Sequence, residues 1–256
     1  MTPRAFLTAE WRHLVMLSWE VAPEVLRPRV PAGTTLDLWH GRALVSVVGF
    51  RFLRTRVLGL PIPGHRDFDE VNLRFYVRRE MPDGEVRRGV TFVRELVPRA
   101  AIALVARLAY AEPYRAVPMR STVPAGEMTD DPGRIVYAWR PARGAPWERV
   151  AATAVGAPRV PGPDDEARFV TEHYWGYTPQ RDGGTVEYRV EHPAWRVWDV
   201  AAPELVADVA RLYGAGFVSA LAGPPSSAFV ADGSPVTVYR PRRVDARARL
   251  QTPRHP

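Results

Sequence analysis

The segment Phe68–Arg79, with the sequence FDEVNLRFYVRR, restricts the fold of this chain more than any other segment. Successive side chains of a β-strand point to opposite faces. A strand here therefore has valine, leucine and phenylalanine on one face and a row of polar side chains on the other: Glu70, Asn72, Arg74, Tyr76 and Arg78. Asn72 is the only asparagine of the sequence. The pattern predicts a strand whose apolar face lies in a core and whose polar face either meets solvent or lines a pocket.

A second strand is predicted directly after the first. Asp83-Gly84 is a strong hairpin-turn signal, and Gly89–Val97 again has strand character. A His40-Gly41 turn is expected to join two more paired strands, Leu36–Trp39 and Arg42–Arg56. Most of the remaining chain has the pattern of short strands joined by turns, with only two or three helices. The sequence thus predicts the α+β class, with a large twisted antiparallel β-sheet curled into a partial barrel or cone and a few flanking helices.

Helical turns are predicted within Ala22–Pro31 and a short helix near Phe217–Ala222, and three further helices have clearer end signals. Pro98–Tyr110 begins with a proline and contains a run of good helix formers. Pro203–Gly214 has a proline at its start and a glycine at its end. Asp164 is the predicted N-cap of a short helix with the sequence EARFVTE. We expect residues 1–244 to form a single domain and the Arg/Pro-rich residues 245–256 to form a mobile tail.

The absence of two residue types excludes several kinds of mechanism. The sequence has no cysteine, and all 35 of its basic residues are arginines, so it has no lysine. Thiolate nucleophiles, cysteine-ligated zinc, lysine Schiff bases and the P-loop are therefore excluded. The sequence also lacks the HExxH and GxSxG motifs and a glycine-rich phosphate loop, and we expect no cofactor and no metal.

The arginine-rich composition does not predict nucleic-acid binding. The formal net charge is +7, but the arginines are spread along the chain among aspartates and glutamates. No apolar segment is long enough to span a membrane, and the first residues lack the apolar region of a secretory signal. We therefore expect a cytoplasmic protein that binds neither nucleic acid nor membrane. The sequence allows a homo-oligomer without specifying one.

The polar face of Phe68–Arg79 is the first candidate site. Arginine presents a planar fork that matches a carboxylate, and burial or a neighbouring arginine shifts the pKa of a glutamate. Such a row suits binding and proton transfer on a small oxygenated acid. The structural alternative is a ladder of salt bridges to Arg94 or Glu95 on the neighbouring strand, which needs no ligand.

Two further clusters combine large polar and aromatic side chains: Arg107, Tyr114 and Arg115 in one, and Glu172, His173, Tyr174, Trp175, His192 and Trp195 in the other. A Pro-Tyr-Arg step in the first cluster projects its side chains from a stiffened backbone. A histidine among aromatic residues can act as a general base. The alternative for both clusters is a core position whose polar atom is satisfied by a hydrogen bond.

Several segments match a known family: WRHLVMLSWEV, DFDEVNLRFYV, GVTFVRELV, ARLAYAEPYRAVPM, FVTEHYWGY and EHPAWRVW. Together they resemble the YqjF-like family of uncharacterised bacterial proteins, over a range from about Phe6 to Val244. The E-x-N-x-R-x-Y-V segment and the later P-Y-R step are the most specific parts. The resemblance implies an acetoacetate decarboxylase-like fold, a twisted antiparallel sheet around a small-molecule cavity. It supports the architecture more than the activity.

The resemblance also bears on the chemistry. Acetoacetate decarboxylase carries paired lysines after a proline, and the matching positions after Pro113 are Tyr114 and Arg115. Arginine stays protonated and is a poor nucleophile, so decarboxylation through an imine is not expected. Glu70 is expected to correspond to an active-site glutamate of the decarboxylase.

We therefore expect a cavity that binds a small molecule with a carboxylate or carbonyl group. Arg74 and Arg115 would hold the anionic group. Glu70 would transfer protons with Tyr114 or His192, in lyase or isomerase chemistry without a covalent intermediate. The predicted catalytic residues are Glu70, Tyr114 and His192, and the predicted ligand-binding residues are Asn72, Arg74, Tyr76, Arg107, Arg115, Glu172, Tyr174 and Trp195. The alternative is a non-catalytic binding or sensing domain, which the lack of lysine and cysteine nucleophiles favours.

Overall fold

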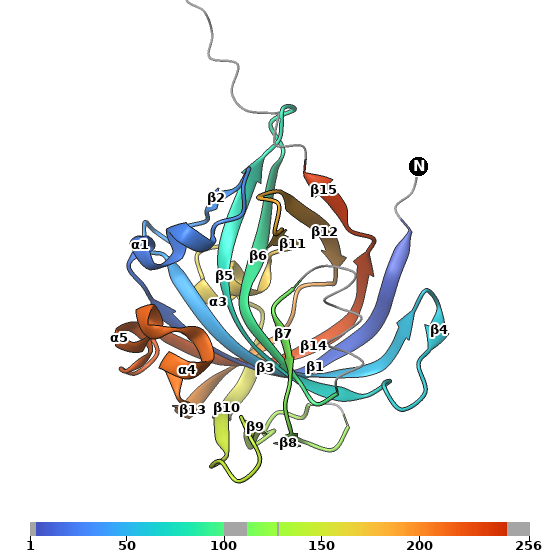
Figure 1. The fold of residues 1–256 in the computed structure, drawn as a ribbon. Coiled ribbons are helices and arrows are strands. Elements are labelled where there is room, and N and C mark those ends of the chain that lie inside the picture. The colour runs from blue at the N-terminus through green and yellow to red at the C-terminus, as the bar shows by residue number, and fades with distance from the viewer. Residues whose placement is uncertain (1–3, 100–111, 127, 245–256) are drawn as a thin grey trace, which may run out of the picture.

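A computed structural model describes residues 4–99, 112–126 and 128–244 of the chain, which form one large twisted sheet with short helices beside it (Figure 1). The strands are β1 (Ala5–Glu20), β2 (Thr35–Leu36), β3 (Leu44–Val57), β4 (Leu60–Pro61), β5 (Phe68–Glu80), β6 (Val86–Val97), β7 (Tyr114–Ala116), β8 (Met119–Thr122), β9 (Arg134–Trp139), β10 (Glu148–Arg159), β11 (Trp175–Pro179), β12 (Thr185–Glu191), β13 (Val197–Val206), β14 (Ser227–Tyr239) and β15 (Arg242–Val244). The helices are α1 (Pro23–Leu26), α3 (Glu166–Thr171), α4 (Val209–Tyr213) and α5 (Val218–Leu221), with 3-10 turns η1 (Arg27–Arg29) and η2 (Ala215–Phe217).

The sheet curls back on itself. Strands β12, β11, β6, β5, β3, β1 and β14 are neighbours in that order, and β12 also pairs with β14 at Val190–Val238 and Glu191–Thr237. The prediction of a large, curled and twisted sheet with few helices is confirmed. The sheet is mixed rather than wholly antiparallel, because β6 runs parallel to both β7 and β11.

Strand β5 has the two faces that its sequence predicts. Its apolar side chains Val71, Leu73, Phe75 and Val77 are fully buried in one hydrophobic core. Burial of each such side chain contributes roughly 1.5–3 kcal/mol. The same core includes apolar residues of α4, η2 and α5, which gather with α1 on one side of the sheet, at the left of Figure 1. The opposite, polar face of β5 therefore looks into the interior of the curled sheet.

The predicted hairpin around His40-Gly41 is present only in part. Trp39 and Arg42 form an isolated bridge around this turn, and both turn residues have positive φ. The short strand β2 does not pair with β3, as the sequence predicted, but with β5 at Thr35–Arg78 and Leu36–Val77. Because β3 already lies between β1 and β5, β2 can extend the sheet only at the end of β5 that β3 leaves unpaired.

The predicted helix over Pro203–Gly214 is wrong in its first half. Residues up to Val206 continue β13, where Glu204 and Leu205 pair with β10. The helix is only α4, and Asp208 caps it by accepting a hydrogen bond from the backbone N–H of Arg211. Pairing with a neighbouring strand thus overrides the proline start signal. The predicted glycine stop is confirmed, because Gly214 follows the helix with a φ of 105°.

The N-cap of α3 is Asp165 rather than the predicted Asp164. The Asp165 carboxylate accepts a hydrogen bond from the backbone N–H of Ala167 at 2.9 Å, and it also pairs with Arg159. Replacement of an N-cap aspartate by alanine typically costs about 1 kcal/mol. We therefore expect Asp165→Ala to lower the melting temperature by roughly 2–4 °C in a chain of this size. The matched control Asp164→Ala, at an exposed neighbouring position, should leave it unchanged in the same thermal-unfolding measurement; an equal loss in both variants would contradict the assignment of the cap.

Two predicted segments lie outside the part of the chain that the structure describes. The helix Pro98–Tyr110 falls there from residue 100 onward, and so does the tail 245–256. Within the described residues, no helix combines the length and the apolar character needed to cross a membrane.

Candidate functional site

A cavity of about 180 Å³ lies inside the curled sheet, against the polar face of β5. Its walls come from strands far apart in the sequence, including β1, β3, β5, β6, β7 and β12. Much of the lining is aromatic: Trp11, Phe50, Phe52, Phe68, Phe92, Trp175 and Trp195. Since a cavity of about 150 Å³ accommodates benzene, this one has room for a small organic molecule.

Glu70 lies on the wall of this cavity and is almost fully buried, with 2% of its surface exposed. Its carboxyl group accepts hydrogen bonds from Asn72 Nδ2 at 3.0 Å and from the Tyr114 hydroxyl at 3.0 Å. Burial raises the pKa of Glu70 to about 7, although both hydrogen bonds and the nearby Arg74 guanidinium act in the opposite direction. Glu70 is therefore close to half-protonated at neutral pH.

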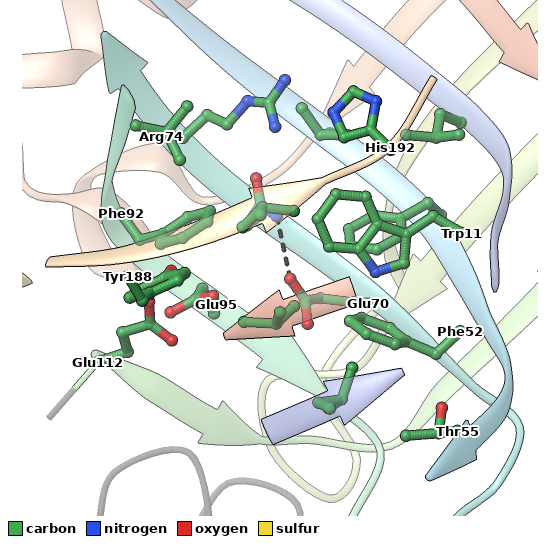
Figure 2. Close-up of a pocket in the computed structure, with 18 of the residues that line it drawn as sticks. Trp11, Phe52, Thr55, Glu70, Arg74, Phe92, Glu95, Glu112, Tyr188 and His192 are labelled. Carbon is green, nitrogen blue, oxygen red and sulfur yellow. Dashed lines mark hydrogen bonds between the residues drawn. The ribbon is translucent and has the colours of Figure 1, made fainter. Parts of the chain in front are cut away.

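Two more glutamates line the same end of the cavity. Glu95 is the cross-strand partner of Asn72 on β6, and Glu112 accepts a hydrogen bond from the Tyr188 hydroxyl. Burial raises the pKa of Glu112 to about 8, and repulsion from Glu70 adds to this effect. Burial, followed by the charges of Glu112 and Glu70, also holds the pKa of Glu95 well above its usual range. Figure 2 shows the three carboxyl groups together with Tyr188 on one side of the cavity.

Arg74 and His192 form a basic side of the cavity, at the top of Figure 2. Arg74 Nη2 donates to the carbonyl oxygen of Val170 at 3.0 Å. The His192 ring stacks on Trp195 with a centroid distance of 4.3 Å, and its Nδ1 lies 2.9 Å from the Pro193 carbonyl oxygen. Burial lowers the pKa of His192, and the Arg74 charge lowers it further. The histidine is thus kept neutral, and Arg74 supplies the positive charge of this side.

Polar side chains in the wall and behind it form hydrogen bonds with one another. His173 lines the cavity and directs Nε2 at the Asp37 carboxylate, 3.0 Å away, while burial lowers the pKa of His173 to about 4. The Tyr76 hydroxyl lies 2.6 Å from Ser46 Oγ, which contacts Ser18 Oγ at 2.7 Å. These hydrogen bonds fix His173 in the wall of the site and Tyr76 behind it.

Six of the predicted site residues come together as lining of the cavity: Glu70, Asn72, Arg74, Tyr114, His192 and Trp195. Four others lie elsewhere. Tyr76 is buried behind the wall, and Arg115 donates to the Pro141 carbonyl oxygen. Glu172 pairs with Arg168, and the Tyr174 ring contacts His192 at a tilted angle from outside the cavity. Arg107 lies outside the described residues.

The ladder of salt bridges does not form across β5 and β6. Arg94 pairs in register with Leu73, on the apolar face of β5, and its Nε reaches the Leu212 carbonyl oxygen. Glu95 lies beside Asn72 and Glu70, so the register brings like charges together instead of opposite ones. Among the residues that the structure describes, none of the three cavity glutamates takes part in an ion pair with arginine or histidine.

Sequence reasoning missed Glu112 and Tyr188 as site residues. Glu112 stands just before β7, which joins the sheet through a parallel pairing with β6. Tyr188 reaches the cavity from β12, more than seventy residues further along the chain. Neither has a local signal, since only the curling of the sheet brings the two side chains together.

Comparisons with known proteins agree with this architecture. A YqjF protein of Bacillus subtilis, described as uncharacterized, is 28% identical over 205 residues, which is 80% of this chain and 80% of that protein. Acetoacetate decarboxylase from Legionella pneumophila matches with a TM-score of 0.64 and 14% identity over 96% of this chain and 90% of its own. The enduracididine biosynthesis enzyme MppR, in complex with pyruvate, matches with a TM-score of 0.65 and 14% identity over 96% and 92%. At these identities the two structures indicate the fold alone.

The family assignment comes from a model that covers most of the chain. The model of the DUF2071 family, described as an uncharacterized conserved protein, matches residues 8–235. This range includes every described residue of the cavity wall from Trp11 to Trp195. The chain is a member of the DUF2071 family, related to YqjF, with an acetoacetate decarboxylase-like fold.

Proposed function

We propose that the cavity binds a small molecule that carries a carboxylate or carbonyl group. The observation that carries the proposal is the position of Glu70, which lies in a largely aromatic cavity with Arg74 four residues along on the same strand face. Arg74 supplies a positive charge for an anionic oxygen, and the aromatic walls exclude water and strengthen that interaction. A structural relative with this fold is named as a complex with pyruvate, a molecule of this class.

In this proposal Glu70 is the group that transfers protons. A general acid or base works best when its pKa is near the working pH, and the pKa of Glu70 is about 7. Burial, and then the charges of the cavity glutamates, raise the pKa of Tyr114 well above 10, so its hydroxyl stays protonated and orients the Glu70 carboxyl. With no lysine in the chain, the chemistry is proton transfer of the lyase or isomerase type without an imine.

We expect Arg74→Ala to weaken ligand binding by roughly 10- to 100-fold, because a hydrogen bond to a charged group contributes about 1.5–3 kcal/mol. Thermal-shift measurements against small keto acids, hydroxy acids, acyl esters and sugar acids would test this. A ligand at about 100 times its dissociation constant stabilises by roughly 2.7 kcal/mol, or about 5–10 °C in a chain of this size.

Arg115→Ala is a matched control for this variant. Each arginine donates a hydrogen bond to a different backbone carbonyl oxygen, Arg74 to that of Val170 and Arg115 to that of Pro141. Unlike Arg74, Arg115 does not line the cavity. The two variants should lose similar, small amounts of stability, and only Arg74→Ala should lose the ligand-induced shift. Equal ligand responses in wild type and Arg74→Ala would contradict the proposal.

The second candidate function is binding without catalysis. The chain has no lysine or cysteine to act as a nucleophile, which favours this function. The hydroxyl groups of Tyr114 and Tyr188 also already donate hydrogen bonds to Glu70 and Glu112. The two functions differ in one measurement. A proton-transfer enzyme catalyses exchange of the carbon-bound hydrogens next to the carbonyl group of a bound keto acid in D₂O, and Glu70→Gln abolishes this exchange. A binding domain shows a thermal shift and no exchange.

A further inference from the structure

The cavity wall presents buried hydrogen-bond acceptors that have no partner. Asn72 Oδ1 and Glu95 Oε2 are both without a hydrogen bond, and these residues are only 2% and 1% exposed. His173 Nδ1 is a third such atom. Because His173 Nε2 points at the Asp37 carboxylate, the ring hydrogen is on Nε2 and Nδ1 is the acceptor. A buried polar atom without a partner costs about 1–3 kcal/mol, so these atoms are suited to a ligand that donates hydrogen bonds.

The unpaired acceptors are adjacent. Asn72 and Glu95 are direct cross-strand partners of β5 and β6, which places their side chains next to each other on the cavity face. The donors at this end are already used, since Asn72 Nδ2 and the Tyr114 hydroxyl donate to Glu70 and the Tyr188 hydroxyl donates to Glu112. A ligand with only carbonyl or carboxylate oxygens would leave Asn72 Oδ1 and His173 Nδ1 unpaired.

Unpaired donors lie elsewhere on the same wall. Arg74 Nε and Trp11 Nε1 are both buried without a hydrogen-bond partner. Arg74 lies two residues from Asn72 on β5, on the same face, so it stands about 7 Å further along the strand. The cavity therefore offers a positive donor and a set of acceptors, one of them a carboxyl group, at a separation that a small molecule can span.

We propose that the ligand is a small amino-carboxylate, whose ammonium group is held by Glu95 and Asn72 and whose carboxylate is held by Arg74. The carboxylate held by Arg74 rests on the proposed function. The ammonium group held by Glu95 and Asn72 goes beyond it. An ammonium group provides three donors and a positive charge, which match two adjacent acceptors in a region with three carboxyl groups. Among the described residues, no group of three His, Cys, Asp or Glu side chains is arranged to hold a metal ion.

The inference predicts the sign of a pH effect. The carboxyl groups are faced by Arg74, His65, His173 and His192 and by the hydroxyl groups of Tyr114 and Tyr188, all of which line the cavity. With pKa values of about 7 for Glu70 and about 8 for Glu112, the glutamates lose protons as the pH rises from 6 to 9. An ammonium ligand should bind more tightly over this range, because it pairs with the charge that forms. A carboxylate without an amino group should bind more weakly, because that charge repels it.

Titration calorimetry with matched pairs tests this directly: L-alanine with propionate, L-valine with 3-methylbutyrate, and 4-aminobutyrate with butyrate. At least one amino member should bind ten-fold or more tightly than its partner, and its affinity should rise from pH 6 to pH 9. Glu95→Gln keeps the size of the side chain and removes the carboxyl group, which can give up its proton to pair with a bound ammonium group. This variant should weaken binding of the amino-carboxylate and leave the affinity for the matching carboxylate without an amino group unchanged. Arg74→Ala should weaken binding of both compounds.

The outcomes separate the two proposals. Equal affinity of the paired compounds, or an affinity for the amino members that falls with pH, would overturn the amino-carboxylate and leave the carboxylate cavity in place. Absence of binding by every carboxylate, including the keto acids above, would overturn both. The pH trend is measured on the wild-type protein, so it stands even if a variant fails to fold.

Discussion

The protein is expected to lose stability as the pH rises from 6.5 to 8, above the range in which the buried His173, with its pKa lowered to about 4, acts in the opposite direction. Glu70 has a pKa of about 7 in the folded protein and near 4.5 in the unfolded chain. Between these two pH values the folded state keeps a proton on Glu70 that the unfolded state has already lost. Its contribution is fully present below pH 4.5 and is lost as the pH rises through 7, with a size on the order of 3 kcal/mol. Glu112, with a pKa of about 8, acts in the same direction and extends the window upward.

Glu112→Gln should flatten this pH dependence, because it keeps an uncharged side chain of similar shape at a site that disfavours charge. At pH 8 and above, the variant should be more stable than the wild type, by several degrees in melting temperature. Glu187→Gln is the matched control, since Glu187 is as deeply buried but is surrounded by Arg79, Arg87 and Arg242. This control should be less stable than wild type throughout the range. A wild-type melting temperature that rises from pH 6.5 to pH 8 would contradict the description of the cavity.

A second large effect is expected at Gly233, on β14. This residue has a φ of 78°, and a Cβ there would overlap the carbonyl oxygen of Trp11 on β1. Both β1 and β14 contribute walls to the curled sheet, so neither backbone can move away without breaking the pairing that Arg12 and Gly233 form. Gly233→Ala combines backbone strain with a clash, and we expect a loss of more than about 4 kcal/mol of unfolding free energy.

Gly223→Ala provides the comparison for Gly233→Ala. A Cβ at Gly223 meets no atom within 4 Å, and its φ is not in the left-handed region. Urea unfolding should therefore give a midpoint for Gly223→Ala close to that of the wild type. A Gly233→Ala protein within about 1 kcal/mol of wild type would show that the two strands tolerate separation at this point.

The sequence of β5 was sufficient to predict its strand, its two faces and one part of the cavity wall. Alternation fixes which side chains share a face, and here the polar row Glu70, Asn72 and Arg74 does line a cavity. The family resemblance predicted the architecture, which the fold comparison confirms. The identity of the cavity's other residues could not be predicted in this way. Glu112 and Tyr188 meet only because β12 closes the sheet against β14, a contact between distant segments.

Local signals failed where tertiary pairing or a single-residue shift decided the outcome. The proline start at Pro203 predicted a helix, but β10 offers backbone partners up to Arg149–Val206, and the strand continues. At α3 the adjacent aspartates are equivalent in the sequence, and only the backbone geometry selects Asp165 as the cap. Arg115 was predicted beside Arg74, yet the short strand β7 turns it to the side opposite Tyr114.

The central claim is that the inner end of the cavity holds carboxyl groups whose pKa values lie at or above neutral pH, because burial leaves their charge without an ionic partner. The most direct test is a ¹³C NMR titration of the glutamate side-chain carboxyl groups in the ligand-free protein, with Glu70→Gln, Glu95→Gln and Glu112→Gln used to assign the resonances. We predict midpoints near 7 for Glu70 and near 8 for Glu112, and a titration of Glu95 well above its usual range. Titration of all three near pH 4.5 would contradict the account, since the cavity would then hold three charged carboxylates at neutral pH.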